Sequence, residues 1–465
     1  MFSRLEDILL TQAILSAALL LVFVAILMKR GLFTWNTSGF WTWAAFLLYF
    51  FANPLASIQY GLDAYRINLE LADGWSRAVW IGFVSLLGMT FVFLGYLSAR
   101  SRPVTLGLQP GNFKLNIFVL GLMVGFSVLA FYSVFTHRIG GDEAARYALV
   151  AAGRFTGNTS GYSYVAHNFI FIPVIFFLLL PNKYLRLVGL ALAGVYVVLR
   201  LSDPWGRWTI ITMLIAISIS QTVWQKQRWP PIIYALGIAF LTGILAIRGH
   251  TGLEGGSQGL LDIIYRLPDE IGPKLADHNS DMLAFWYLQS YIVDELTGYS
   301  YGIPLLNYVF LGFIPSRIFS QKYFLLEWMR SWYPPVVDPL ITSRMIGAKW
   351  SLLGSYYDIG GVIAVIILAF LTGILIRKLD GMLAPESSSL AKTIGICWMS
   401  SLWIIWAGQD AWAFQNLGIF AIPAIIAWFI MPKPWLTFIP GVYVNWRVPP
   451  INRSIESTSQ AGRRR

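Results

Sequence analysis

The sequence predicts an all-α membrane protein, a helical bundle of about eleven transmembrane helices. Of the 465 residues, 57% are hydrophobic and 12% are charged, and a soluble protein of this size could not bury so much apolar surface. The apolar residues also form runs that approach the length of about 20 residues that a helix needs to cross a bilayer. We count such runs at 8–28, 39–56, 77–97, 115–136, 164–180, 185–200, 208–224, 232–247, 361–377, 393–409 and 414–431.

These runs divide the chain into four parts. Residues 1–247 hold the first eight predicted spans, with outer loops at 57–76, 137–163 and 201–207. Residues 248–360 form a large outer loop, residues 361–431 hold the last three spans, and residues 432–465 are a basic tail. A loop of 113 residues (248–360) is too long to be an idle link, and we expect it to carry function.

Lysine and arginine gather in alternate short connections, among them Lys29-Arg30 and Arg377-Lys378. The positive-inside rule makes these connections cytoplasmic. The inner side then holds 18 basic and 3 acidic residues, and the outer side 16 basic and 20 acidic residues. The predicted topology therefore has an outer amino terminus and a cytoplasmic carboxyl terminus.

The basic residues on the predicted outer side are mostly arginine. That side has 13 Arg and 3 Lys, against 11 Arg and 7 Lys inside. A guanidinium holds phosphate oxygens with two parallel hydrogen bonds, whereas an ammonium is a mobile point charge. The composition favours a phosphorylated ligand on the outer side. Nucleic acid is not an expected partner, because no basic stripe on a soluble domain accompanies the net charge of +11.

The stretch RLSDPWGRWTIITML (200–214) packs Arg200, Asp203 and Arg207 into a short outer turn. Arg207 is expected near the amino terminus of the next helix, where free backbone amides and the helix dipole favour an anion. Asp203 could orient a guanidinium or act as a base. The alternative is an ordinary Arg–Asp pair that caps the turn.

Other outer residues extend this candidate site. Arg248 and His250 leave the eighth predicted span at the same depth, so both could face one cavity. Histidine exchanges protons near neutral pH, as a general base must, although a single loop histidine can also be merely exposed. Arg146 and Arg154 lie in the outer loop 137–163.

The large loop contains three apolar and aromatic segments, at 281–295, 303–315 and 322–332. Each is too short or too charged to span a membrane. Helices rich in Trp and Tyr suit the headgroup layer, so these segments are predicted either to lie there as interfacial helices or to pack on the outer ends of the spans. In either place, these segments would cover the outer end of the bundle.

Several function classes are disfavoured. The sequence has no nucleophilic serine elbow, no HExxH, no P-loop and no DxD motif. Its only cysteine, Cys397, lies in a predicted span and forms no cluster for zinc or an iron–sulfur centre. We expect no metal and no cofactor, so the energy for any reaction would arrive with the substrate.

Three stretches carry a resemblance to the Wzy-type oligosaccharide repeat unit (O-antigen) polymerases. SDPWGRWTIITMLIAISIS (202–220) resembles their short outer turn with an arginine before an apolar helix. YVFLGFIPSRIFSQK (308–322) is similar to their segment with Arg317 and Lys322 at the matching positions, and SLLGSYYDIGGVIAVIILAFLTGIL (351–375) to the start of the span after the large loop. Ser355 stands where the family often has an acid, and Asp358 where it often has Asn.

The resemblance implies a membrane-embedded glycosyltransferase of GT-C-like architecture in the bacterial cytoplasmic membrane, with a periplasmic amino terminus. It would act on donor and acceptor oligosaccharides linked to undecaprenyl pyrophosphate, often beside a chain-length regulator. The expected pyrophosphate clamp is Arg207, Arg248 and Arg317. Arg146, Arg154 and Arg344 are further candidates for the second carrier or for sugar, His250 is the preferred base, and Asp203 or His278 is the fallback.

Two other functions stay open. An O-antigen ligase would use the same lipid-linked donor and transfer the polymer to a lipid core. A polysaccharide transporter or flippase would make no bond. Transporters usually place ionisable groups near the bilayer midplane, often on broken helices, whereas the charges of this sequence cluster at predicted helix ends.

Overall fold

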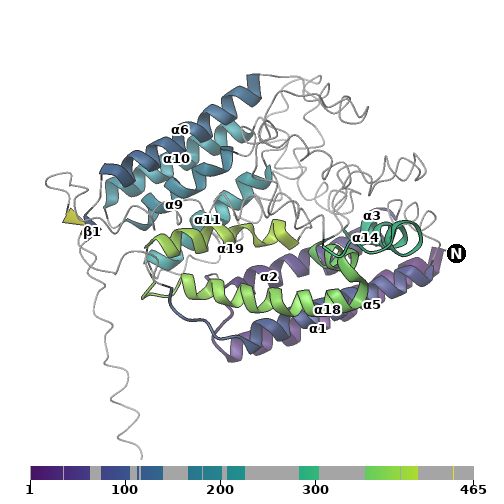
Figure 1. Cartoon of the computed structure of the whole chain (residues 1–465). Coiled ribbons are helices and arrows are strands. Elements are labelled where there is room, and N and C mark those ends of the chain that lie inside the picture. The colour runs from purple at the N-terminus through teal and green to yellow at the C-terminus, as the bar shows by residue number, and fades with distance from the viewer. Residues whose placement is uncertain are drawn as a thin grey trace, which may run out of the picture.

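The protein was studied as a computed structural model (Figure 1). It describes residues 2–34, 36–62, 75–104, 113–114, 117–139, 166–180, 182–201, 207–225, 282–302, 351–387, 389–406 and 443–444. The helices in these ranges are α1 (Phe2–Lys29), α2 (Ser38–Leu47), the π-helix η1 (Leu48–Ala52), α3 (Asn53–Tyr60), α5 (Trp75–Ser98), α6 (Ile117–Ile139), the 3-10 helix η2 (Ala166–Ile170), α9 (Phe171–Leu179), α10 (Lys183–Leu201), α11 (Arg207–Gln225), α14 (Met282–Tyr291), the π-helix η4 (Ile292–Thr297), α18 (Ser351–Met382) and α19 (Ser389–Trp406). The strands β1 (Phe113–Lys114) and β2 (Tyr443–Val444) form a two-residue antiparallel pair.

Nine of the eleven predicted spans coincide with helices of the described residues. The remaining two, 232–247 and 414–431, lie outside the described ranges. Four helical segments of the described chain are long and apolar enough to cross a membrane: Leu5–Lys29, Ser38–Tyr60, Trp75–Ser98 and Ser351–Met382. The chain is therefore a helical, membrane-associated protein.

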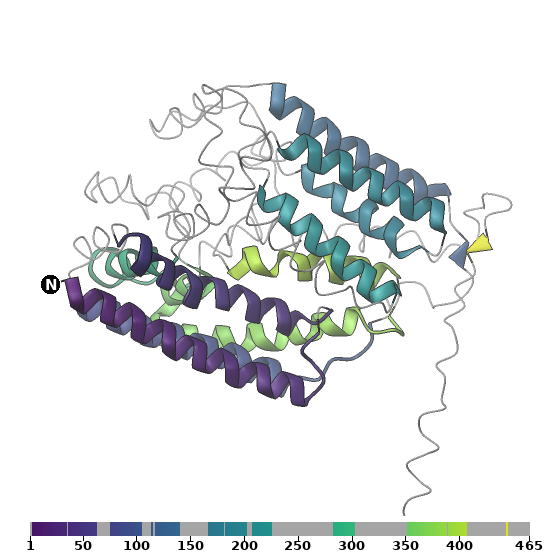
Figure 2. The same cartoon turned by 180° about the vertical axis from the view of Figure 1, so that it is seen from behind.

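The helices form two groups that are joined through α19 (Figures 1 and 2). One group contains α1, α2, α3, α5, α14 and α18, and the other contains α6, α9, α10 and α11. Trp403 of α19 donates an indole hydrogen bond to Thr212 of α11 at 3.2 Å. Trp406 donates one to Thr42 of α2 at 3.3 Å. Because α19 bonds to both groups, it fixes one against the other.

The middle of the second predicted span is widened into the π-helix η1. Pro54 lies in the first turn of α3, directly after η1. Proline has no amide proton, so it cannot donate to the carbonyl four residues earlier. The helix continues through this position as a π turn, in which the Asn53 amide bonds to the Leu48 carbonyl five residues earlier.

Glycine residues allow α5 and α18 to pack with their backbones in contact. A Cβ added at Gly95 would lie 2.0 Å from the carbonyl oxygen of Phe370, and one at Gly373 would lie 2.1 Å from that of Val92. Small residues at such a crossing are typical of membrane helices, which associate through close van der Waals contact.

α18 is folded back on itself at Gly360–Gly361. Gly360 and Gly361 leave helical geometry, and Gly361 has a φ of +64°. The Tyr356 hydroxyl hydrogen-bonds to Thr372, whereas residues 16 positions apart in a straight helix lie about 24 Å apart. The first arm, 351–359, therefore folds back against the second arm, 362–382. The sequence prediction missed the first arm, because it placed the start of this span at residue 361.

The two ends of the first helix group are distinguished by their charges. Arg30, after α1, donates to the carbonyl of Leu97 near the end of α5 at 3.1 Å. A Cβ on Gly381 of α18 would touch the carbonyl of Arg102. Residues predicted to be cytoplasmic, Arg30, Arg102 and Arg377, thus gather at one end of the group. We call it the Asp380 end, and the opposite end the Arg77 end.

Apolar side chains remain exposed along the described helices. On α18 they form a stripe at every fourth position: Ile363, Ile367, Leu371 and Leu375, each at least 47% exposed. Residues four apart lie on one helix face. A face of this kind is stable in contact with lipid, in agreement with a membrane location.

Candidate functional site

Most of the residues predicted for the site lie outside the described residues. These are the catalytic candidates Asp203, His250 and His278, and the phosphate-binding candidates Arg146, Arg154, Arg248, Arg317 and Arg344. Arg207 is the first residue of α11. This agrees with its predicted place at a helix amino terminus, where the backbone amides of the first turn have no partner within the helix.

Arg200, from the same predicted stretch, is also among the described residues. It lies in the last turn of α10, is only 3% exposed, and directs its Nε toward the Thr209 hydroxyl of α11 at 3.4 Å. A guanidinium is costly to bury unless it is paired. A buried cation is thus held next to the first turn of α11.

The large predicted loop contains the buried helix α14. Trp286, Tyr287 and Leu288 are each 0% exposed, and α14 contacts both α5 and α18. A helix in the headgroup layer would keep its polar face in water. For 281–295 the structure therefore favours packing on the spans, while 303–315 and 322–332 lie outside the described residues.

A polar cluster joins the Arg77 end of α5 to η4 and α18. The Arg77 guanidinium donates to Asp294 Oδ2 at 2.8 Å and to Glu295 Oε1 at 3.1 Å. The Tyr357 hydroxyl donates to Asp294 Oδ2 at 2.9 Å and accepts a bond from the Trp80 indole at 3.3 Å. We call Arg77, Trp80, Asp294, Glu295 and Tyr357 the Arg77 cluster. It anchors one end of η4 to two membrane helices.

The segment after η4 completes the helical hairpin of α18. The backbone amide of Ser300 donates to the Asp358 carbonyl at 2.9 Å, and that of Tyr301 donates to the Ile359 carbonyl at 3.0 Å. These carbonyls lie at the end of the first arm, where intrahelical donors are missing. The pairing satisfies them and holds residues 300–301 at the tip of the hairpin.

Tyr299 lies between this tip and the Arg77 cluster. Its hydroxyl approaches Asp294 Oδ1 at 3.5 Å. Partial burial and the neighbouring Asp294 carboxylate both raise the pKa of the Tyr299 hydroxyl. The hydroxyl therefore stays protonated, and remains a hydrogen-bond donor, at any ordinary pH.

We expect Arg77→Gln to loosen η4 from the bundle. The substitution removes a cation that bonds to two carboxylates, and hydrogen bonds to charged groups contribute about 1.5–3 kcal/mol each when they are sheltered. Glu295 is largely exposed, so its bond contributes little. We predict a loss of about 2 kcal/mol, measured by unfolding in SDS. Arg100→Gln, at an exposed arginine of the opposite end, is the control, and equal losses in the two variants would contradict the role of Arg77.

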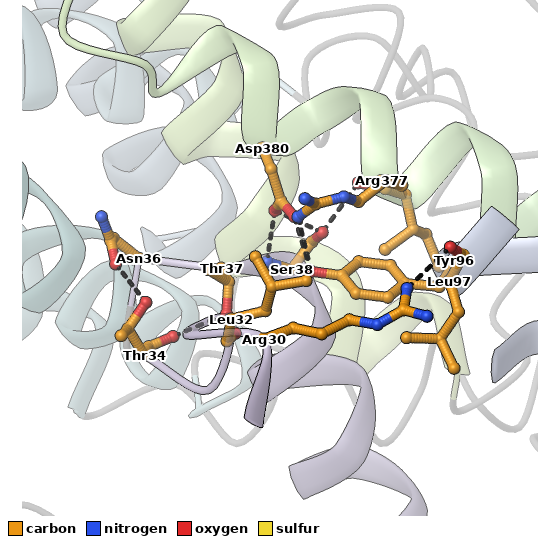
Figure 3. A network of polar contacts seen from close by, with 11 residues as sticks. Arg30, Leu32, Thr34, Asn36, Thr37, Ser38, Tyr96, Leu97, Arg377 and Asp380 are labelled. Atoms are coloured by element: carbon orange, nitrogen blue, oxygen red, sulfur yellow. Dashed lines mark hydrogen bonds and ion pairs between the residues drawn. The ribbon is translucent and has the colours of Figure 1, made fainter. Parts of the chain in front are cut away.

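A second polar network lies at the Asp380 end (Figure 3). Asp380 of α18 accepts hydrogen bonds from the Ser38 amide at 2.7 Å and from the Ser38 hydroxyl at 2.6 Å. It also accepts bonds from the Tyr96 hydroxyl at 2.6 Å and from Arg377 Nη1 at 2.7 Å. The bonds from Ser38 and Tyr96 tie α2 and α5 to α18, and the ion pair with Arg377 lies within α18.

This network supplies a helix cap from another part of the chain. Thr37, the residue before α2, makes no capping bond with its side chain. Its hydroxyl instead donates to carbonyls in the preceding turn, at Leu32 and Thr34. The Asp380 carboxylate acts as the cap of α2 instead. It accepts a hydrogen bond from the first amide of the helix, and its negative charge lies near the positive end of the helix dipole.

Sequence reasoning singled out neither polar group. Arg77 and Asp294 are 217 positions apart, and each was counted only as an outer charge. Asp380 was counted as one of three acids on a basic inner side. The isolation of Asp380 among lysine and arginine was a usable signal, since an acid at that place suggests an ion-pair partner.

In the described residues, no group of three or more His, Cys, Asp or Glu side chains could hold a metal ion.

Comparisons of the chain with family models, curated proteins and solved structures gave no match.

Proposed function

We propose that the protein is a polymerase of oligosaccharide repeat units linked to undecaprenyl pyrophosphate, acting at the outer leaflet of a bacterial cytoplasmic membrane. The observation that carries this proposal is the pair of arginines on either side of residues 202–206. Arg200 is buried at the end of α10, and Arg207 begins α11. A helix amino terminus that begins with an arginine, and that follows a helix ending near another arginine, suits a pyrophosphate.

The reaction would be a glycosyl transfer. A hydroxyl oxygen of the incoming repeat attacks the anomeric carbon of the growing chain, and the bond from that carbon to the pyrophosphate oxygen breaks. The bonding electrons leave with undecaprenyl pyrophosphate, and the hydroxyl proton passes to a base, for which His250 is our first candidate. Arginines fixed in a water-poor site would stabilise the charge that develops on the leaving group.

The test is elongation of lipid-linked repeats by the purified chain in detergent. We expect Arg207→Lys to lower the rate about 100-fold, because an ammonium cannot replace a two-pronged guanidinium. Arg100→Lys makes the same change at an exposed arginine of the Asp380 end and should keep the full rate. Wild-type elongation by Arg207→Lys would remove this residue from the site.

One observation favours transport as a second candidate. The first arm of α18 starts at Ser351 and places Leu353 beside Gly88, near the middle of α5. Transporters bind substrates at helices that begin inside the membrane. The second arm (362–382) has about 20 residues, however, enough to span the membrane by itself. Elongation by the purified protein separates enzyme from transporter.

A ligase is distinguished by what accumulates in cells. Deletion of a polymerase leaves lipid carrying a single repeat unit. Deletion of a ligase leaves long polymer that is not attached to its lipid core. Analysis of the glycolipids of a deletion strain therefore decides between these two enzymes, which share the donor and differ in the acceptor.

A further inference from the structure

Exposed aromatic rings gather at the Arg77 end of the first helix group. Trp80 is 44% exposed, Tyr299 is 40% exposed and Tyr301 is 76% exposed. Trp80 reaches Tyr357 through its indole, and Tyr299 packs edge to face on the same Tyr357 ring at 6.4 Å. Trp80 and Tyr299 are therefore held through Tyr357 of the Arg77 cluster, while part of each ring faces outward.

Tyr301 is exposed, and its backbone is in an unfavourable conformation. Its φ is +53°, a left-handed conformation that is uncommon for a bulky residue and costs about 1 kcal/mol or more. Its amide is tied to the Ile359 carbonyl, and the adjacent Gly302 also has a positive φ. The chain thus fixes the turn in a strained form and presents the tyrosine ring to the surroundings.

Two carboxylates lie beside these rings. Asp294 is 22% exposed and Glu295 is 55% exposed at the side chain. Arg77 bonds to one oxygen of each, and the hydroxyls of Tyr357 and Tyr299 lie within 3.5 Å of Asp294 Oδ1. With one cation against two anions, this place does not suit a phosphate group. It does suit a hydroxyl-rich ligand, because carboxylate oxygens accept hydrogen bonds from hydroxyl groups.

We propose that Tyr299, Tyr301, Asp294 and Glu295 form a carbohydrate-binding surface. A sugar ring has a face of C–H groups, which packs on an aromatic ring, and a rim of hydroxyls, which donate to carboxylates. Rigid tyrosine rings give contact area at a low cost in conformational entropy. For the identity of the sugar the inference rests on the proposed function: the ligand is the glycan of the repeat unit, held apart from its pyrophosphate.

The experiment measures glycan binding directly. The full chain is placed in phosphatidylcholine nanodiscs and titrated with soluble fragments of one to three repeats, released by mild acid from the surface polysaccharide of the producing cell. Saturation-transfer NMR reports contact between protein and sugar protons and yields the Kd. The variants are Tyr301→Gly, which removes the ring and suits the positive φ, and Glu295→Gln.

We expect Tyr301→Gly to weaken binding about tenfold and Glu295→Gln about fivefold. The control is Tyr184→Ala, which removes a tyrosine that is 68% exposed at the start of α10 and should leave Kd unchanged. Absence of binding to the wild type, or wild-type affinity of Tyr301→Gly, overturns the surface.

The same variants separate this inference from the proposed function. If the wild type elongates lipid-linked repeats while Tyr301→Gly binds and elongates normally, the surface is wrong and the polymerase stands. If Tyr301→Gly loses glycan binding while the wild type elongates nothing, the surface stands and the polymerase is wrong.

Discussion

A single methyl group added at Gly373 is expected to disrupt the packing of α18 on α5. The new Cβ of Gly373→Ala would lie 2.1 Å from the Val92 carbonyl oxygen and 2.7 Å from the Tyr96 nitrogen. Both atoms belong to the backbone of α5, so no side-chain rotation relieves the clash. We predict a loss of about 3 kcal/mol or more in the free energy of unfolding.

The matched control is Gly125→Ala on α6. A Cβ at Gly125 meets nothing within 4 Å, and alanine is favoured over glycine inside a helix by about 1 kcal/mol. The same substitution should therefore be neutral or stabilising there. Unfolding in an SDS titration, followed by tryptophan fluorescence, measures both variants. Equal midpoints for Gly373→Ala and the wild type would mean that the two helices do not approach this closely.

Gly95→Ala tests the same contact from the α5 side. Its Cβ would lie 2.0 Å from the Phe370 carbonyl oxygen. Once one methyl group has forced the helices apart, the second meets an already widened gap. The double variant should accordingly lose clearly less stability than the sum of the two single variants.

The helices could be predicted from the sequence because their signal is local. A run of apolar residues such as 77–97 needs no partner to be recognised, and α5 covers that run. The hairpin of α18 could not be predicted in the same way. The predicted span began only at residue 361, and the fold at Gly360–Gly361 depends on contacts with α5 and with residues 300–301.

The candidate site was predictable only in part for the same reason. Arg207 at the start of α11 follows from the local order of turn and apolar run. The Arg77 cluster depends on an ion pair across more than 200 positions, and the pattern of either segment does not reveal the other. Burial of Trp286 in α14 also depends on tertiary packing, because its aromatic composition suits a membrane surface equally well.

The second large effect is expected at Asp380. Asp380→Ala leaves the Arg377 guanidinium, 15% exposed, without its carboxylate, and it removes the cap of α2 and the acceptor of the Tyr96 hydroxyl. Removing one partner of a buried ion pair costs about 3–5 kcal/mol, since the other charge stays in a poorly solvated place. We predict a loss in this range for Asp380→Ala, and a smaller loss for Asp380→Asn, which can still accept from Ser38.

The double variant Asp380→Ala/Arg377→Met separates the buried charge from the cap. Methionine takes away the unpaired guanidinium, so this chain should recover part of the stability lost in Asp380→Ala, while the uncapped α2 keeps the rest of the loss near 1 kcal/mol. Glu386→Ala, at an exposed acid after α18, is the control and should unfold at the wild-type SDS fraction. If Asp380→Ala unfolds there too, Asp380 does not join the three helices. If the double variant recovers nothing, the loss arises from the cap and from Tyr96, and the stranded charge of Arg377 contributes little.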